Sequence, residues 1–217
     1  MSIQVAIDGP AGSGKGTVTK LVAEKCNLIY IDTGVTYRCV TLKMLENGVS
    51  LEEEDKVIEI AENINIEFTI DGKTLLDGID VSDKISSKEV TKLVSFVSSI
   101  VRVRELMVEV QRKMASDNNV IMEGRDITTV VLPNAKYKFY LDASVDERAR
   151  RRFEQNKEKN IEMSLEEIKE NIEKRDYNDM HKEVGSLTRT DEQIYIDSTN
   201  MTIEEVVDII VNEIGSE

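Results

Sequence analysis

Tryptophan is absent from this sequence of 217 residues, which also has only two prolines, two cysteines and one histidine. Cys26 and Cys39 form neither a metal-binding spacing nor a disulfide framework, which favours a reducing, cytoplasmic compartment. The histidine, His181, lies in no triad-like setting, and we expect it on the surface. No apolar run approaches the roughly 20 residues of a membrane span, and residues 1–4 lack the basic start of a signal peptide.

Positive charge is also in short supply. Lysine and arginine total 28 against 42 aspartates and glutamates, which gives a net charge of −14. A chain this acidic is repelled by nucleic-acid phosphates and by anionic membranes, so we expect neither as a partner. Hydrophobic residues make up 40% and charged residues 32% of the chain, a mixture typical of a folded protein. The length suits one α/β domain with a sizeable core.

Short apolar segments alternate with segments of helical periodicity. This order predicts a parallel sheet with helices on both faces. The first apolar segment runs into a glycine-rich loop, and the second precedes Asp32-Thr33-Gly34 and a helix through about residue 46. The predicted strands are 3–7, 28–31, 120–122, 138–141 and 194–196.

One stretch departs from this alternation. Ile64, Ile66, Phe68 and Ile70 follow a strict period of two, and Asp71-Gly72 then supplies the residues of a tight hairpin. We interpret residues 62–85 as a small antiparallel insert between two helices of the core. The alternative is an edge hairpin of the main sheet.

Five pairs of a hydroxyl and a carboxylate three residues apart predict helix starts. In such a capping box each side chain satisfies a backbone donor that the first turn leaves unpaired. The pairs are Ser50/Glu53, Ser86/Glu89, Ser144/Glu147, Ser164/Glu167 and Thr202/Glu205.

The glycine-rich loop carries the strongest chemical signal. In Gly9-x4-Gly14-Lys15 the backbone turns tightly, its N–H groups can approach an anion, and a helix follows. Lys15 can reach the β- and γ-phosphates of a nucleotide. The usual Ser or Thr after the lysine is replaced by Gly16, with Thr17 one position later, which leaves direct contact with Mg²⁺ open. The alternative is a glycine-rich turn without a ligand.

Arginine is scarce and clustered, whereas lysine is scattered. Arginine clamps phosphates with two parallel hydrogen bonds and stays charged, so clustered arginines suit phosphoryl transfer, which needs positioning and charge neutralisation. For the run at 148–152, ion pairs on a solvated helix face are the alternative. The clustered positions are Arg38, Arg102, Arg104, Arg125, Arg148, Arg150, Arg151, Arg152 and Arg175.

These motifs together resemble the bacterial cytidylate (CMP) kinases over nearly the whole chain. The loop alone is generic, but Asp-Thr-Gly-x-x-Tyr-Arg and Gly-Arg-Asp-Ile-x-Thr-Val-Val are specific. The matching segments are 7–15, 32–38, 124–133, 139–144 with the arginine run, 175–179 and 196–199.

The resemblance implies ATP-dependent phosphorylation of CMP or dCMP, with Mg²⁺ accompanying ATP, in a monomeric cytoplasmic enzyme of pyrimidine metabolism. ATP would be held by Gly9, Pro10, Ala11, Gly12, Ser13, Gly14, Lys15, Gly16 and Thr17, with Thr17 reaching the metal through water. CMP would be bound by Thr33, Arg38, Ser95, Arg104, Arg125, Asp126, Arg175, Asp179 and Lys182. The catalytic set would be Lys15, Arg125, Arg151 and Arg152, the last two on a mobile lid.

The expected fold is therefore an α/β P-loop kinase with a parallel central sheet. The core would comprise 1–61 and 86–217, the lid about 148–180, and the acceptor-binding insert 62–85. Lid and insert are expected to close on substrate and exclude water. Three further departures from the family stand out: Lys182 replaces its usual arginine, Ser186 its usual proline, and Glu123 the aspartate often found before Gly-Arg-Asp.

Three other functions remain open. A P-loop kinase for another small acceptor, such as shikimate, gluconate or a different monophosphate, would share the loop but not the base-reading residues. A GTPase would need Asn-Lys-x-Asp, whereas residues 156–159 end in Lys159. A non-enzymatic acidic scaffold would leave the loop and the clustered arginines unexplained.

Overall fold

The structure is a computed structural model that describes residues 2–116, 118–158 and 161–215. Of the predicted lid, residues 159–160 lie outside this range, and so do residues 1, 117, 216 and 217 of the predicted core. Contacts divide the chain into two compact units. One contains Ile29–Val120 with the first residues of the chain, and the other contains Gln4–Leu28 and Ile121–Glu217. The predicted domain division, with its boundaries at 62 and 85, stays a prediction.

The predicted strands are confirmed as a five-stranded sheet in the order β2-β6-β1-β7-β8. Parallel pairing aligns Ile7 with Phe139 and Leu141 with Ile196. The central strands β1, β6 and β7 are nearly continuous apolar runs and are largely buried, as is typical of a parallel sheet that helices cover, whereas β8 is mostly exposed. Their bounds are β1 Gln4–Asp8, β2 Ile29–Asp32, β6 Val120–Gly124, β7 Tyr137–Asp142 and β8 Ile194–Asp197.

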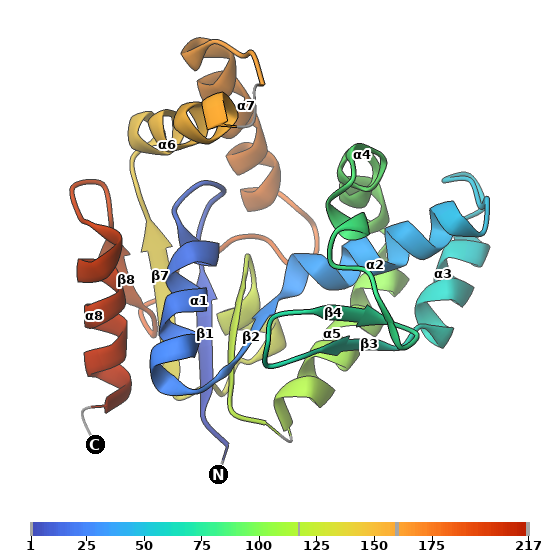
Figure 1. Cartoon of the computed structure of the whole chain (residues 1–217), viewed down its shortest axis with the longest axis horizontal. Helices are drawn as coiled ribbons and strands as arrows, with labels where there is room; N and C mark the ends of the chain where they lie inside the picture. The colour runs from blue at the N-terminus through green and yellow to red at the C-terminus, as the bar shows by residue number, and fades with distance from the viewer. Residues whose placement is uncertain (1, 117, 159–160, 216–217) are drawn as a thin grey trace. The chain divides into compact units, whose positions relative to one another are not determined.

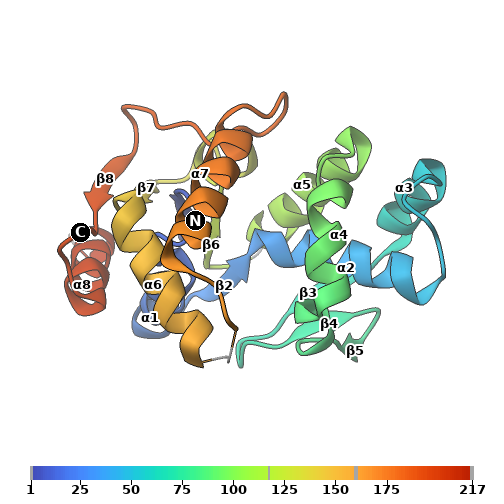
Figure 2. The ribbon, with the colours of Figure 1, turned by 90° about the horizontal axis from the view of Figure 1, so that it is seen from above.

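Four α-helices among the described residues belong to the unit that contains β1. They are α1 (Lys15–Cys26), α6 (Val145–Glu158), α7 (Leu165–Met180) and α8 (Ile203–Gly215). Helices α1 and α8 lie side by side (Figure 1). Helices α6 and α7 pack along each other through Ala149, Ile168 and Ile172 (Figure 2). The α6–α7 pair covers most of the predicted lid.

The other unit combines helices with a separate small sheet. Its helices are α2 (Thr33–Glu46), α3 (Glu54–Asn63), α4 (Lys88–Val97) and α5 (Val101–Ser116). The antiparallel strands β3 (Ile66–Phe68), β4 (Thr74–Leu76) and β5 (Ile79–Asp80) form a sheet in that order. The insert is thus a sheet of its own, and the edge-hairpin alternative is excluded. The period of two ends at Phe68, because Ile70 lies in the turn and is 77% exposed.

The capping boxes are only partly confirmed. Ser164 with Glu167 and Thr202 with Glu205 form both hydrogen bonds at the starts of α7 and α8. Helix α4 is capped by Ser87, which accepts from Val90 N, so the predicted cap at Ser86 is wrong by one residue. At Ser144 half of the box forms: Ser144 Oγ accepts from Glu147 N, while the Glu147 carboxylate pairs with arginines of α6.

None of the helices in the described part of the chain combines the length and the apolar character needed to cross a bilayer.

Candidate active site

The glycine-rich loop joins β1 to α1 and leaves no room for side chains at its turns. A Cβ at Gly9 would lie 2.0 Å from the carbonyl oxygen of Leu141 on β7. Gly14, at the start of α1, has a φ of 92°, a conformation that glycine adopts without strain. Glycine therefore allows the loop to pass against β7 and enter α1 directly, so the helix N-terminus with its partial positive charge faces the loop.

Lys15 folds back over this loop. Its Nζ lies 2.8 Å from the carbonyl oxygens of both Gly9 and Pro10, and the residue is 5% exposed. Burial lowers the pKa of Lys15 to about 7, helped by the positive charge of Arg125 and opposed by the carboxylate of Glu123. A bound anion would offset the burial cost and favour the charged form. Lys15 is thus a buried amine at the glycine loop whose charged form a bound anion would favour.

Helix α6 supplies two arginines that hold carbonyl groups of the same loop. Arg148 donates to Ala11 O at 3.1 Å and pairs with Asp176 of α7 at 2.6 Å. Arg151 donates to Ser13 O at 3.2 Å. Arg152, the next residue, is exposed and has no hydrogen bond or ion pair within the described residues. The arginine run is therefore divided between contacts to the loop and a side chain open to solvent.

Glu147 shows that the solvated-helix alternative is correct in part. Its carboxylate accepts from Arg150 and Arg151, three and four residues further along α6. These hydrogen bonds, the larger effect from Arg150, lower the pKa of Glu147 to about 2. Arg150 is exposed and pairs with Glu147, so local ion pairing accounts for it.

A buried network follows the end of β1. Asp8 is fully buried and accepts from the backbone N–H groups of Ile127 and Thr128, at 2.7 and 2.9 Å, and from Thr128 Oγ1 at 2.6 Å. Gln193 Nε2 donates to the same Thr128 hydroxyl. Burial raises the pKa of Asp8, while its hydrogen bonds oppose the shift. The network fixes the π-helical turn Ile127–Val131, which directly follows Arg125 and Asp126.

Asp179 of α7 gathers cations. Its carboxylate accepts from Arg125 Nε at 2.7 Å and pairs with Lys182 Nζ at 3.1 Å, while Arg175 Nε lies 3.9 Å away. Burial alone would raise the pKa of Asp179, but the charges of Arg125 and Lys182 outweigh it and lower the pKa. We call Asp179, Arg125, Arg175 and Lys182 the Asp179 cluster. All four are predicted acceptor-binding residues, and the structure brings them together.

Asp126, the other predicted acceptor-binding residue of this unit, is buried at the start of the Ile127–Val131 turn. Its backbone carbonyl accepts from Val130 N at 2.8 Å. The position of this carboxylate is thus set by the turn that Asp8 holds.

Four predicted acceptor-binding residues lie in the other unit. Thr33 is buried at the start of α2, where Asp32 caps the helix by accepting from Gly34 N. Arg38 donates to Ile85 O and Thr91 Oγ1, both at 3.0 Å. Arg104 is buried with its guanidinium 5.9 Å from the ring centre of Tyr37, and Ser95 is exposed on α4. That these four residues bind the acceptor together with residues of the unit that contains β1 stays a prediction.

The described side chains supply few ligands for a metal ion. Within the described residues no group of three or more His, Cys, Asp or Glu could hold an ion. Thr17 is exposed on the first turn of α1, and its hydroxyl has no partner in the described part of the chain. An available hydroxyl beside a phosphate-binding loop fits Mg²⁺, which keeps several waters and is held mostly by substrate phosphates.

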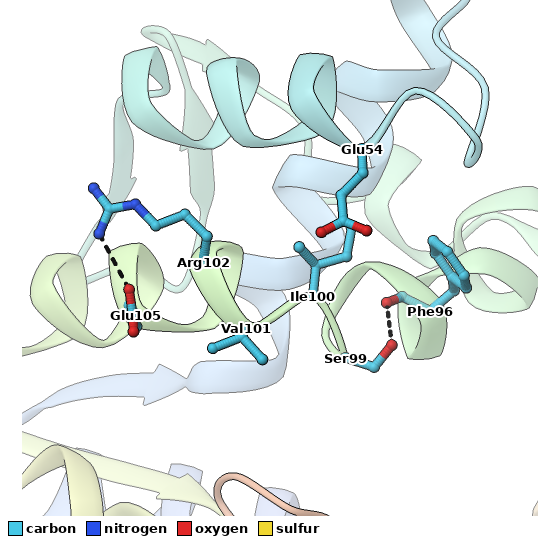
Figure 3. A pocket seen from close by; sticks show the side chains of 7 residues that line it. All are labelled: Glu54, Phe96, Ser99, Ile100, Val101, Arg102 and Glu105. Carbon is cyan, nitrogen blue, oxygen red and sulfur yellow. Dashed lines mark hydrogen bonds and ion pairs between the residues drawn. The ribbon is translucent and has the colours of Figure 1, made fainter.

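A surface pocket of about 510 Å³ lies in the unit of α3, α4 and α5, between Glu54, Phe96 and Arg102 (Figure 3). Arg102 donates to Glu105, and Ser99 Oγ donates to the carbonyl of Phe96, so these polar groups of its wall are already paired within the protein. None of the predicted site residues lines this pocket.

Sequence reasoning missed three residues that hydrogen-bond to the glycine loop or to the turn Ile127–Val131. Asp8 could have been found, because a carboxylate that ends a buried apolar strand before a glycine loop needs partners. Gln193 carries no such signal, and Ser198 entered only as part of the matching segment 196–199, because the contacts of both residues join segments far apart in the sequence. Gln193 contacts Thr128, and Ser198 Oγ lies 3.4 Å from Ser13 O.

Known proteins resemble this chain over nearly its whole length. The family model described as cytidylate kinase matches residues 5–216. A cytidylate kinase of Caldanaerobacter subterraneus subsp. tengcongensis is 47% identical over 99% of this chain and 95% of its own length. One of Fusobacterium nucleatum subsp. nucleatum is 46% identical, with 98% and 97% covered. The fold is similar to that of a shikimate kinase from Acinetobacter baumannii in complex with shikimate, at a TM-score of 0.50 and 15% identity, covering 100% of this chain and 94% of that one. The chain belongs to the cytidylate kinase family.

Proposed function

We propose that the protein transfers the γ-phosphoryl group of ATP to CMP or dCMP and releases ADP with CDP or dCDP. The observation that carries the proposal is the full-length match to the cytidylate kinase family, in a chain whose loop holds Lys15 at the start of α1. The expected placement of a monomeric enzyme in the cytoplasm stays a prediction.

The donor phosphates belong at the glycine loop. Lys15 exchanges the carbonyls of Gly9 and Pro10 for the β- and γ-phosphates, and these anions favour its charged form because they replace its lost hydration. The N-terminus of α1 adds its partial charge. Arg152 is open to solvent and suits a guanidinium that meets the transferring group, where an arginine can contribute about 10³–10⁵ in rate.

The acceptor phosphate needs cations and no base. A phosphate oxygen is already ionised near neutral pH, so the reaction does not require a residue to remove its proton. His181 agrees with this, because it is exposed and engaged with the ring and carbonyl of Tyr177. We assign Arg125 and Lys182 to the acceptor phosphate, and Arg175 and Asp179 to the sugar. Thr33 and Arg38 would add further phosphate contacts.

Magnesium enters with ATP in this scheme. It would neutralise charge on the donor phosphates. Thr17 would hold it through a water molecule, since Gly16 occupies the position that normally carries the metal-binding hydroxyl. The protein's own part is to position the phosphates with Lys15 and the loop.

The base is assigned to Asp126 with Ser95 and Arg104. Cytosine presents an amino donor where uracil presents a carbonyl acceptor, so a carboxylate attracts the first and repels the second. Asp126 is buried, and a buried site with mismatched hydrogen bonds rejects the wrong ring strongly.

Asp126→Ala tests this assignment. We expect the ratio of kcat/KM for CMP over UMP to fall by about 10- to 100-fold, which corresponds to one lost polar contact of ~1.4–2.8 kcal/mol. A coupled ADP-release assay across CMP, dCMP, UMP and AMP measures it, with the wild type as control. Unchanged discrimination would refute the role of Asp126. A wild type that phosphorylates UMP or AMP more efficiently than CMP and dCMP would refute the proposed function itself.

A further inference from the structure

Arg151 uses every nitrogen of its guanidinium inside the protein. Nε donates to Glu147 Oε1 at 2.9 Å on its own helix. Nη1 donates to Ser13 O and to Ser198 Oγ, both at 3.2 Å, and Nη2 donates to Ser198 O at 2.7 Å. A side chain with its donors committed in this way has little capacity left for a substrate phosphate.

The Ser13 carbonyl is the critical acceptor. In a trans peptide the carbonyl and the next N–H point in opposite directions, so holding Ser13 O toward Arg151 turns the N–H of Gly14 away from the guanidinium. Gly14 has the positive φ of 92°, and a Cβ there would lie 3.6 Å from Arg151 Nη1. Arg151 therefore sets the direction of an amide at the N-terminus of α1, where an anion is expected.

Ser198 is the other residue outside α6 that Arg151 contacts. It directly follows β8, is buried, and its hydroxyl lies 2.9 Å from Asp142 O and 3.4 Å from Ser13 O. Its backbone N–H also donates to Asp142 O. Ser198 is thereby fixed to the end of β7, so Arg151 connects α6 and the phosphate loop to a rigid point of the sheet.

The neighbouring Arg152 differs from Arg151 in its contacts and its exposure. It follows Arg151 on the same helix, is exposed, and makes no hydrogen bond or ion pair with the residues that the structure describes. We propose that Arg151 is a positioning residue that fixes the glycine loop for nucleotide phosphates, while Arg152 is the arginine that meets the phosphates. The inference rests on the proposed function, because it takes the loop to be the ATP site.

The experiment compares Arg151→Ala and Arg151→Lys with Arg152→Ala. We measure kcat, KM for ATP, and the dissociation constants of ATP and ADP by calorimetry. For Arg151→Ala we expect nucleotide binding to weaken at least tenfold for ATP and ADP alike, with kcat changed less than threefold. Lysine should recover little, because an ammonium cannot hold Ser13 and Ser198 together in one plane. Arg152→Ala should lower kcat mainly.

A spectroscopic readout separates loop geometry from charge. In the nucleotide-free protein the ¹⁵N–¹H resonance of Gly14 should shift in both Arg151 variants and stay in place in Arg152→Ala. Ser198→Ala serves as a milder variant if Arg151→Ala fails to fold. It should move the same resonance and raise KM for ATP a few-fold, with an effect that is not additive with Arg151→Lys.

The opposite results overturn the inference. A hundredfold loss of kcat in Arg151→Ala with unchanged ATP and ADP affinity would make Arg151 a direct transition-state contact. An unmoved Gly14 resonance in the Arg151 and Ser198 variants would show that they do not set the loop. Either result with an active wild type defeats this inference alone, whereas a wild type that does not bind ATP defeats the proposed function.

Discussion

The glycine loop and the Asp179 cluster, both in the unit of β1, use opposite arrangements of charge. In the loop, cations hold carbonyl groups: Lys15 contacts Gly9 and Pro10, and Arg151 contacts Ser13. In the Asp179 cluster a carboxylate holds cations, among them Arg125 and Lys182. Holding carbonyls fixes the directions of backbone N–H groups, whereas a buried carboxylate compensates cations that would otherwise repel one another. In the loop the contacts thus set the backbone geometry, whereas in the Asp179 cluster they compensate opposite charges.

Removing the central cation of the loop should have the largest effect. Lys15→Ala is expected to lower kcat by at least about 10³-fold, because a preorganised charge in a water-poor site is lost. The melting temperature should stay at or above that of the wild type, since a buried cation with a lowered pKa is removed. Coupled ADP release and circular dichroism measure the two quantities. Near-normal turnover would contradict the scheme.

Removing the central carboxylate of the Asp179 cluster should act on stability first. Asp179→Ala leaves Arg125 facing Lys182 and is expected to lower the free energy of unfolding by about 2 kcal/mol. This is less than the 3–5 kcal/mol of a fully buried pair, because Arg125 keeps 20% exposure. Denaturant titration at pH 7 measures it. The matched control is Asp208→Ala, whose partner Lys25 is exposed, and which should change little.

The stability that Asp179 contributes depends on pH, and the sign of this dependence follows from its pKa. The folded-state pKa of Asp179 lies below its ordinary value of 3.8. Its contribution is therefore complete above pH 4 and is lost as the pH falls through the folded-state pKa. The stability difference between wild type and Asp179→Ala should be equal at pH 7 and pH 5. A difference that halves between these values would contradict the lowered pKa.

The lowered pKa of Lys15 predicts a smaller, pH-dependent change in the loop. Above about pH 7 the free protein has lost the Lys15 proton, whereas a bound phosphate favours the charged form. ATP binding should take up close to one proton at pH 8.5, and its dissociation constant should rise by up to about tenfold per pH unit. Calorimetry in buffers of different ionisation enthalpy measures the uptake. Lys15→Arg should abolish it, and uptake that persists in that variant would assign the proton to another group.

The smallest expected effect concerns Lys182, where the family usually has arginine. An ammonium neutralises an acceptor phosphate but cannot form two parallel hydrogen bonds with it. Lys182→Arg should lower KM for CMP about two- to fivefold with kcat nearly unchanged. Steady-state kinetics with CMP as the varied substrate measures it. A raised KM would indicate that the position is fitted to lysine through its 3.1 Å contact with Asp179.

Sequence alone determined the elements whose signals are local. The five apolar strands, the glycine loop with Lys15, and the antiparallel insert follow from periodicity and turn residues within a few positions of each other. Where a cap was misplaced, as at Ser86, two adjacent serines offered the same hydroxyl and backbone geometry chose Ser87. Local chemistry thus decided which elements form, and the ends of the predicted strands differ from the observed ones by at most two residues.

Tertiary structure alone decided which of the equivalent-looking side chains face the loop. Arg151 and Arg152 are neighbours with the same chemistry, yet one holds Ser13 and Ser198 while the other remains exposed. Their directions depend on how α6 packs against α7 and the loop, a property of segments up to 185 residues apart, as Ser13 and Ser198 are. A helix of 3.6 residues per turn sends adjacent residues to different faces, and only packing specifies which face lies inward.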